Sequence, residues 1–188
     1  APMELTDESF EQQDFQGAGF PAREIQDCHF SKCNFQQVDL SHKKFLDCTF
    51  SHCNLSVASF ANTTIRGCTF VQSKCLGVNW AAVNRFENAA FEGCQLDSSI
   101  FMNLDLRGSE FKQCQLKEVD FSDSDLRKVG FEDCDLLGAT FRGSNLEGAD
   151  LSTARQYEID HRYAKIRGLK VTLPEAVSLL RGLEVKIL

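Results

Sequence analysis

Cysteine and histidine lie close together at two places in this sequence of 188 residues, and both residue types bind zinc. The two groups are Cys28-His29-Cys33 and Cys48-His52-Cys53. Four residues separate the cysteines of each group, which is not a usual spacing for a zinc knuckle. The chain has nine cysteines, and an odd number in a reducing compartment indicates reduced thiols more than a disulfide framework.

Other residues that could support catalysis or phosphate binding are isolated. His42 and His161 have no evident serine or cysteine nucleophile as a partner. The Gly17-Ala18-Gly19 segment is glycine-rich, but no helical pattern follows it, so we predict a turn and not a phosphate-binding loop. The sequence therefore offers no constellation that predicts an enzyme.

Charge is the third chemical feature of the chain, and it is unevenly distributed. The net charge of −7 argues against direct binding of nucleic acid or anionic membrane and permits a basic partner. Residues 1–151 hold 23 acidic and 13 basic residues, whereas residues 152–188 hold 4 and 7. Within the first part, residues 86–151 carry 14 acids against 6 bases. No apolar run approaches the ~20 residues of a membrane span, and no signal peptide is recognised, so we expect a cytoplasmic protein.

A period of five residues determines where all these side chains lie. Bulky apolar residues recur at every fifth position from Phe10 to Trp80 and, after one extra residue, from Phe86 to Leu151. Of these 29 centres, 27 are Phe, Leu or Ile, and they include all sixteen phenylalanines of the chain. Two residues before the centre the side chain is Ala, Cys, Ser, Thr or Val in 23 cases. Two residues after it glycine recurs, which indicates a turn with positive φ.

Neither an α-helix nor a flat strand keeps every fifth side chain on one face, whereas a chain that turns a corner every five residues does so. Four such sides make a square coil of 20 residues, with the centre and the small residue both pointing inward. The columns support this period, because Phe30, Phe50 and Phe70 are 20 residues apart. We therefore predict an all-β protein, a right-handed quadrilateral β-helix of about seven coils and about 35 Å at the ~4.8 Å spacing of paired strands.

The predicted coil argues against zinc binding by the two groups of cysteine and histidine. Eight cysteines occupy the small inward position and Cys75 is itself a centre, while His29 and His52 occupy outward positions. The side chains of each group should therefore diverge, and we expect buried thiols, no metal and no cofactor. A solid aromatic core also leaves no cleft for catalysis, so the expected protein is not an enzyme. A redox or metal protein that uses the cysteines remains the weakest of three functional alternatives.

The last residues depart from the period. Residues 152–171 are mildly basic, and Thr172-Leu173-Pro174-Glu175 has the pattern of a capping box before a helix. Apolar residues then form one helix face, followed by an alternating pattern that predicts a short terminal strand. We predict three segments: a lead-in over 1–7, the repeat over 8–151, and a capping and dimerisation segment over 152–188. The residues expected to form the dimer contact are Leu173, Ala176, Val177, Leu180, Leu183, Val185 and Ile187.

The repeated pattern of a small residue, a polar residue, Leu or Phe and two variable residues resembles the pentapeptide-repeat superfamily over about residues 8–151. The stretch Tyr157–Asp160 followed by Leu173–Leu180 is similar to the end of the quinolone-resistance and microcin-immunity branch. That resemblance implies a homodimer joined through the C-terminal helix. It also implies an acidic rod that mimics B-form DNA and binds DNA gyrase or topoisomerase IV, without binding nucleic acid or membrane itself. The resemblance further implies resistance or immunity to agents that target gyrase, or modulation of supercoiling. Relatives that protect gyrase from quinolones carry sizeable loops, whereas this chain has only a one-residue insertion near Ala81–Arg85, which counts against drug protection and leaves gyrase binding open.

The carboxylates that would replace phosphates belong to two adjoining sides, those with Leu106 and Phe111 among their centres. They are Glu87, Glu92, Asp105, Glu110, Asp125, Glu132, Asp133, Glu147 and Asp150. Four bases oppose them: Arg107, Lys112, Arg127 and Lys128. Two other interpretations remain open: a scaffold that binds another protein, and a solvated surface in which Asp before a centre stabilises the corner turn. Arg23 and Lys43 lie at nominally inward positions, where we expect a local bulge or side chains that extend to solvent.

Overall fold

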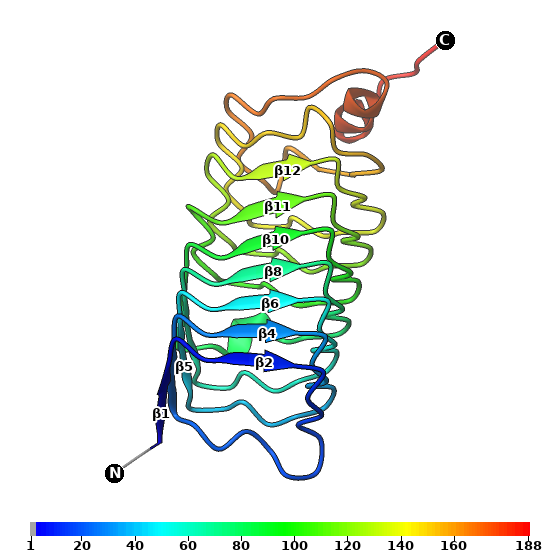
Figure 1. Cartoon of the computed structure of the whole chain (residues 1–188). Coiled ribbons are helices and arrows are strands. Elements are labelled where there is room, and N and C mark those ends of the chain that lie inside the picture. Colours follow the sequence, from blue (N-terminus) through cyan, green and yellow to red (C-terminus); the bar gives the residue numbers. More distant parts are fainter. Residues whose placement is uncertain (1–2) are drawn as a thin grey trace.

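The computed structural model describes residues 3–188, and in it the chain winds into a stack of four-sided coils. Figure 1 shows one side of this stack facing the viewer, with the C-terminal helix at the far end from the N-terminus. The predicted right-handed quadrilateral β-helix is confirmed, since successive strands of each sheet pair in parallel 20 or 21 residues apart. We name the sides A, B, C and D in the order in which the chain visits them in each coil.

Sides A and B carry the strands. Side A has the sheet order β1-β3-β5-β7-β9, and side B has β12-β11-β10-β8-β6-β4-β2. The strands of side A are β1 (Glu4–Thr6), β3 (Glu24–Gln26), β5 (Lys44–Leu46), β7 (Thr64–Arg66) and β9 (Arg85–Glu87). The strands of side B are β2 (Ser9–Glu11), β4 (His29–Ser31), β6 (Thr49–Ser51), β8 (Thr69–Val71), β10 (Ala90–Glu92), β11 (Glu110–Lys112) and β12 (Gly130–Glu132). Within residues 3–188, sides C and D are joined by isolated bridges, such as Asn34↔Asn54 on side C and Asp39↔Ser59 on side D.

The centres of the repeat fill the inside of the coils. On side B the rings of Phe30, Phe50 and Phe70 are buried and stack in parallel, with centroids 4.9 and 5.0 Å apart. Neighbouring columns meet edge to face, as Phe45 does with Phe50 at 5.6 Å. Stacked and edge-to-face pairs are the favoured arrangements of aromatic rings. The rod is therefore filled by side chains along its length.

The corners depend on residues in the left-handed region. All eight glycines two positions after a centre have positive φ, from 62° at Gly77 to 79° at Gly17, which confirms the predicted turn. Residues with side chains take the same conformation at other corners, such as Asp47 and Val57. The polar residue before a centre supports the corner as well. For example, the side-chain oxygen of Asn54 accepts the backbone N–H of Ser56 at 3.1 Å.

The one-residue insertion accompanies the only tryptophan of the chain. Trp80 is buried and stacks between Phe60 and Phe101, with centroids 4.8 and 5.9 Å away. It begins the 3₁₀ helix η1 (Trp80–Ala82), after which β9 pairs Phe86 with Ile65. The extra residue is therefore absorbed in one tight turn of side D, and the coil continues in frame.

The first coil begins earlier than predicted. Leu5 in β1 pairs with Ile25 in β3, so the expected lead-in over 1–7 already belongs to the β-helix from residue 4, while residues 1 and 2 lie outside the described residues. A bulge forms at the end of this coil, as expected, because Ala22 is buried in place of the exposed Arg23.

Lys43 remains inside the coil, so the expected extension of this side chain to solvent is wrong. Its ammonium donates hydrogen bonds to the carbonyls of Phe20 at 2.6 Å and Ala22 at 2.8 Å. It also lies 5.7 Å above the ring of Phe20. These carbonyls compensate part of the cost of burying the charge, and they are available because the bulge turns them inward.

Stacking also continues beyond the predicted end at residue 151. The bridges Asn145↔Lys165 and Asp150↔Lys170 extend sides A and B by another coil. The period is hidden in this coil because Tyr157 fills the core one position after the expected centre. Gln156, which occupies that centre in the sequence, is exposed with a φ of 60°. The backbone register recovers by Lys165.

The C-terminal helix η2 (Glu175–Leu183) is a 3₁₀ helix, and it packs Leu179 against the core. The predicted capping box does not form, because both of its residues bind the last coil. The Thr172 hydroxyl donates to Ser152 O at 2.6 Å, and a Glu175 carboxylate oxygen accepts Gln156 N–H at 2.9 Å. The predicted terminal strand is also absent from the described residues, since residues 184–188 extend away from the coil and meet no strand (Figure 1).

Candidate partner-binding surface

The cysteines are buried and free, as the inward positions of the repeat predicted. The eight thiols at the small inward position donate to backbone carbonyls of the coil, as Cys53 does to Phe30 O at 3.3 Å and Ser51 O at 3.4 Å. Burial raises the pKa of Cys53 to about 12, so the thiol stays protonated at neutral pH. His29 and His52 are exposed, and residues 3–188 contain no group of three His, Cys, Asp or Glu that could hold a metal ion. The thiols act as small core groups.

The nine predicted carboxylates divide between two sides that have different electrostatic character. Four belong to side A and five to side B, and all are at least partly exposed. The side A residues are Glu87, Asp105, Asp125 and Glu147. The side B residues are Glu92, Glu110, Glu132, Asp133 and Asp150, which we call the side B carboxylate row. Because adjoining sides of a square coil face different directions, a flat partner contacts one of these sets more closely than the other.

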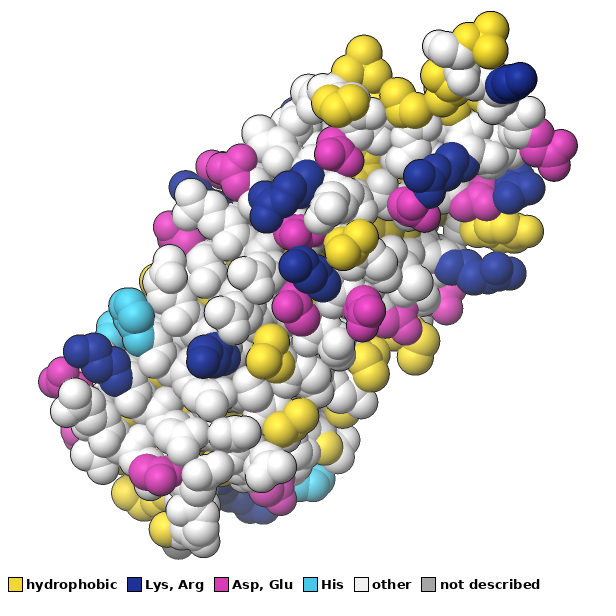
Figure 2. Space-filling model, turned by 90° about the vertical axis from the view of Figure 1, so that its right-hand side faces the viewer, with side chains coloured by type: hydrophobic (Ala, Val, Ile, Leu, Met, Phe, Trp, Pro, Cys, Tyr) yellow, Lys and Arg dark blue, Asp and Glu magenta, His cyan; other side chains and the backbone are white. Residues whose placement is uncertain are grey.

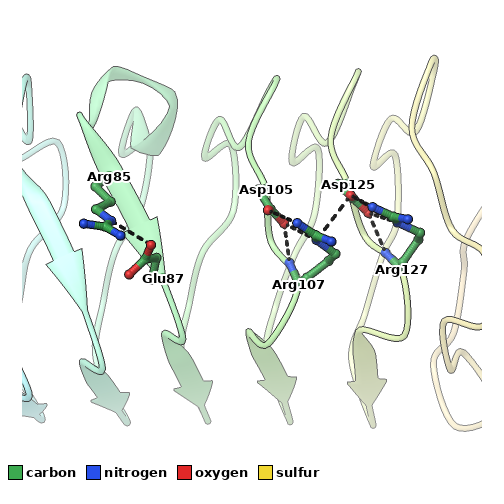
Figure 3. Close-up of polar contacts among 6 residues, drawn as sticks. All are labelled: Arg85, Glu87, Asp105, Arg107, Asp125 and Arg127. Carbon is green, nitrogen blue, oxygen red and sulfur yellow. Dashed lines mark hydrogen bonds and ion pairs between the residues drawn. The ribbon is translucent and has the colours of Figure 1, made fainter.

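On side A three of the four carboxylates, Glu87, Asp105 and Asp125, are bound by arginines of the same side (Figure 3), while Glu147 takes part in no ion pair within residues 3–188. The Arg107 guanidinium lies 2.6 Å from an Asp105 oxygen and 3.4 Å from Asp125, which in turn is 2.6 Å from Arg127. Hydrogen bonds from Arg107 and Arg127 lower the pKa values of Asp105 and Asp125, respectively. The outcome is a ladder of alternating charge along the rod.

The extra coil makes side A cationic at its C-terminal end. The bridge Asn145↔Lys165 places Lys165 and Arg167 on this side, next to Glu147 and beyond the ladder. From Arg85 to Arg167, side A thus holds four carboxylates and six cations: Arg85, Arg107, Arg127, Lys128, Lys165 and Arg167. The expectation that both adjoining sides form one acidic surface is wrong for side A. The signal was present in the 20-residue spacing of Asn145 and Lys165, but the predicted repeat ended at residue 151.

Side B keeps an excess of negative charge. The same coil adds Lys170, so side B over this length has five carboxylates against Lys112 and Lys170. Lys112 lies 3.6 Å from Glu132, and Lys170 lies 3.8 Å from Asp150. Among residues 3–188, Glu92, Glu110 and Asp133 take part in no ion pair, and all three are exposed. These three are the side B carboxylates that no cation of the coil pairs with.

Charged residues also gather on side C, where sequence reasoning singled out none. Figure 2 views the face to the right of the β2–β12 sheet, and both signs are interleaved on its C-terminal half, while its N-terminal half is mostly uncharged. Asp135 is the buried member of this set. Its carboxylate accepts Leu137 N–H at 3.1 Å and lies 3.6 Å from Arg155 and 3.8 Å from Lys117. The signal was present in the 20-residue spacing of Asp135 and Arg155, but Arg155 lay outside the predicted repeat.

The tail presents the apolar surface that was predicted for dimerisation. Six of the seven predicted residues are exposed in the single chain and Ala176 is partly exposed. The side chains of Leu173, Leu183 and Ile187 are 78%, 53% and 58% accessible, and Figure 2 shows apolar side chains gathered at this end of the rod. Arg181 pairs with Glu158, which together with Leu179 fixes the helix on the last coil. A contiguous exposed apolar surface of this kind is typical of an interface.

Comparisons with known proteins agree with the coil. A family profile described as the pentapeptide repeat region matches residues 3–80 and 84–161, on either side of the insertion. The chain belongs to the pentapeptide-repeat family. No curated protein matches this pentapeptide-repeat chain by sequence.

Solved structures show the same fold at low sequence identity. Full-length QnrB1, a plasmid-mediated fluoroquinolone resistance protein, is 19% identical with a TM-score of 0.53, over 97% of this chain and 100% of QnrB1. A trypsin-treated QnrB1 variant is 21% identical with a TM-score of 0.50, over 100% of both chains. HetL, a pentapeptide-repeat protein involved in heterocyst differentiation regulation from the cyanobacterium Nostoc, is 13% identical with a TM-score of 0.49, over 91% of this chain and 87% of HetL. Within residues 3–188 no helix has the length and apolar character needed to cross a bilayer.

Proposed function

We propose that this pentapeptide-repeat protein is a cytoplasmic, non-enzymatic DNA mimic that binds a type II topoisomerase, DNA gyrase or topoisomerase IV. The observation that carries the proposal is the side B carboxylate row on a rigid rod. The similarity of the fold to QnrB1 supports it, because QnrB1 is a fluoroquinolone resistance protein. A groove that binds DNA is lined by cations, and an ordered row of carboxylates can compete for it.

The mimicry is approximate in its charge density. Coils repeat at about 4.8 Å, whereas duplex DNA carries one charge per ~1.7 Å of its axis. With five carboxylates over five coils and two cations nearby, side B has a weaker field than DNA. The row therefore contributes mainly to the rate of association and to orientation, and its effect declines as salt screens charges beyond ~8–10 Å.

A homodimer through the tail is part of the proposal. Its support is the exposed apolar surface of Leu180, Leu183, Val185 and Ile187 at the end of the rod. Two copies joined there would form a rod of about twice the length, with the cations of the last coils near its middle and a carboxylate row on each half. Binding would then involve the two halves and not the middle.

A supercoiling assay with purified gyrase, with and without a fluoroquinolone, tests the proposal. The variant Glu92→Gln/Glu110→Gln/Asp133→Asn removes the three free carboxylates of side B and keeps their shape. Glu4→Gln/Glu8→Gln/Glu11→Gln changes the net charge equally at the other end of the rod and is the control. We expect the parent and the control to alter gyrase activity at micromolar concentration and the side B variant to require more protein. Equal activity of the folded variants would refute the site.

The alternative is a scaffold that binds another protein, and the mixed charges of sides A and C favour it. Alternating ion pairs such as those of Asp105, Arg107 and Asp125 suit a partner with both signs of charge. The same assay decides between the two functions. If the parent has no effect on gyrase or on topoisomerase IV at micromolar concentration, the scaffold takes precedence.

A further inference from the structure

Gly130 is a glycine that neither the backbone nor the packing requires. It is the first residue of β12, its φ is outside the left-handed region, and a Cβ added to it would meet no atom within 4 Å. The preceding coils carry side chains at the same position of side B, such as Thr69, Ala90 and Glu110. Glycine within a strand weakens it and often marks a place where a ligand or another chain approaches closely.

The missing side chain opens a hollow on the edge between sides A and B. Its volume is about 310 Å³, and it crosses two coils. The hollow is lined by Gly108, Ser109, Glu110, Phe111, Lys112, Lys128, Gly130 and Glu132. A volume of this size accommodates one large side chain.

Carboxylates surround the bare strand on three sides. Glu110 and Asp150 flank Gly130 in register on the preceding and following coils, and Glu132 lies two residues along β12. Glu110 takes part in no ion pair within residues 3–188. Lys112 is already bound by Glu132 at 3.6 Å, and the stem of Lys128 lies toward Gly148 on the next coil. Lys128 also lines the hollow and takes part in no ion pair within residues 3–188, but its stem is directed toward Gly148, so the charge beside the bare strand is that of Glu110 and favours a cationic occupant there.

A buried hydroxyl in the wall of the hollow has no partner. Ser109 is 3% exposed, and its Oγ makes no hydrogen bond within the described residues. In the same inward position on side A of the following coil, Ser124 donates to Phe101 O at 2.6 Å. An unpaired buried polar group is uncommon in proteins and calls for an explanation. Because Ser109 occupies an inward position, its hydroxyl faces the core, and the features of the hollow that point to an occupant are Gly130 and Glu110.

We infer that the hollow at Gly130 receives an arginine side chain of the protein that binds side B. The guanidinium binds Glu110, and the apolar stem lies over the bare backbone of Gly130. Arginine fits better than lysine, because its planar fork binds a carboxylate through two parallel hydrogen bonds. This inference rests on the proposed function for the identity of the partner, but its chemistry requires only an arginine on a protein surface.

A side chain added at Gly130 should fill the hollow and reduce binding of the partner without destabilising the protein. Gly130→Ala and Gly130→Val add side chains where space is open, so both variants should fold, and Gly130→Ala should raise the melting temperature. We expect Gly130→Val to lower the affinity for gyrase about tenfold or more, the loss of one well-placed charged contact. Ala90→Val is the control, because it adds bulk at the same position two coils away. Unchanged affinity of folded Gly130→Val would overturn the inference.

A second measurement works without the topoisomerase. N-acetyl-argininamide titrated into ¹⁵N-labelled protein should shift the amide signal of Gly130 in the parent and in Ala90→Val, and not in Glu110→Gln. If the parent has no effect on gyrase but the Gly130 signal shifts, the proposed function fails and the arginine site stands. If gyrase is affected and neither the titration nor Gly130→Val shows a difference, the arginine site fails and the proposed function stands.

Discussion

Val57 is a β-branched residue in a backbone conformation that disfavours it. It lies at the corner between sides C and D with a φ of 48°, is 49% exposed, and places its Cγ1 above Gly77. Left-handed backbone brings Cβ too close to the following carbonyl, and asparagine tolerates it better than valine. Most corners of the coil avoid this cost with Gly, Asn, Asp or a long polar residue.

Replacing Val57 by Asn should therefore stabilise the protein. We expect the free energy of unfolding to rise by about 1 kcal/mol, the lower end of the cost of a left-handed residue. Urea unfolding followed by the fluorescence of the buried Trp80 measures it. Val71→Asn is the matched control, because Val71 lies in β8 with an ordinary backbone, and there the change should not stabilise. An equal effect at both positions would show that the corner is unstrained.

Lys43 is a charged residue buried inside the coil, and its burial makes the stability of the protein depend on pH. Burial lowers the pKa of this ammonium below 10.5, and the neighbouring Asp39 raises it only in part. The folded protein thus releases the proton at a lower pH than the unfolded chain. Between the pKa of Lys43 in the folded protein and its value of about 10.4 in the unfolded chain, the unfolded chain binds more protons. The contribution of Lys43 to the free energy of unfolding therefore rises with pH in this range.

The variant Lys43→Met isolates this contribution. It removes the donor to Phe20 O and Ala22 O and should destabilise the protein by about 1–3 kcal/mol near pH 7. The difference between parent and variant should grow in favour of the parent as the pH is raised from 8 toward 10. Urea unfolding over this range, with a reductant present for the thiols, measures both effects. A constant difference would mean that Lys43 is not buried as a charged group.

At the scale of the elements, the five-residue period predicted what depends on local repetition. The centres, the inward thiols and the positive φ at corner glycines follow from the spacing alone. The period failed where a neighbouring coil, and not the local sequence, determines the conformation. Tyr157 replaces Gln156 in the core because the stacked coil tolerates a shift of one residue, and no spacing rule anticipates this. The candidate site lacked Lys165 and Arg167 because the shift at Gln156 and Tyr157 ended the predicted repeat at residue 151, although the register recovers by Lys165.

The end of the chain illustrates the same dependence on long-range contacts. Thr172 and Glu175 form a local capping pattern, but each finds a partner on the preceding coil instead. The alternating residues 183–187 predict a strand, and a strand needs a neighbour to pair with. Within residues 3–188 of one chain there is none at that place. That a second copy of the chain binds the apolar face of η2 therefore remains a prediction.

Two adjacent leucines of η2 have different expected roles, one in the fold and one in the dimer. Leu179 packs against the core, whereas Leu180 is 38% exposed. Leu180→Asp should leave the melting temperature of the monomer nearly unchanged and convert a dimer into a monomer, since an unpaired charge in an apolar interface costs several kcal/mol. Leu179→Asp should lower the melting temperature instead. Sedimentation of both variants tests this, and a parent that is already monomeric would refute the dimer.

At the scale of the whole molecule, three sides of one rod carry different charge patterns. Side A holds a ladder of ion pairs that ends in cations, side C mixes both signs around Asp135, and side B has an excess of carboxylates over cations. The charge patterns stay on different faces of the rod because the corresponding sides of successive coils face the same direction. A partner that recognises DNA should therefore bind side B in preference to the other sides, and the charges of the rod should determine its orientation on the partner.

Competition with DNA tests this claim most directly. A fluorescent duplex bound to gyrase is displaced by increasing concentrations of protein, and the anisotropy of the duplex is measured. We expect displacement by the parent at micromolar concentration, weaker at higher salt. The variant Glu92→Gln/Glu110→Gln/Asp133→Asn should need about tenfold more, because three exposed charge contacts together contribute about 1.4 kcal/mol. A parent that leaves the duplex bound, or a variant that displaces it equally well, would contradict the account.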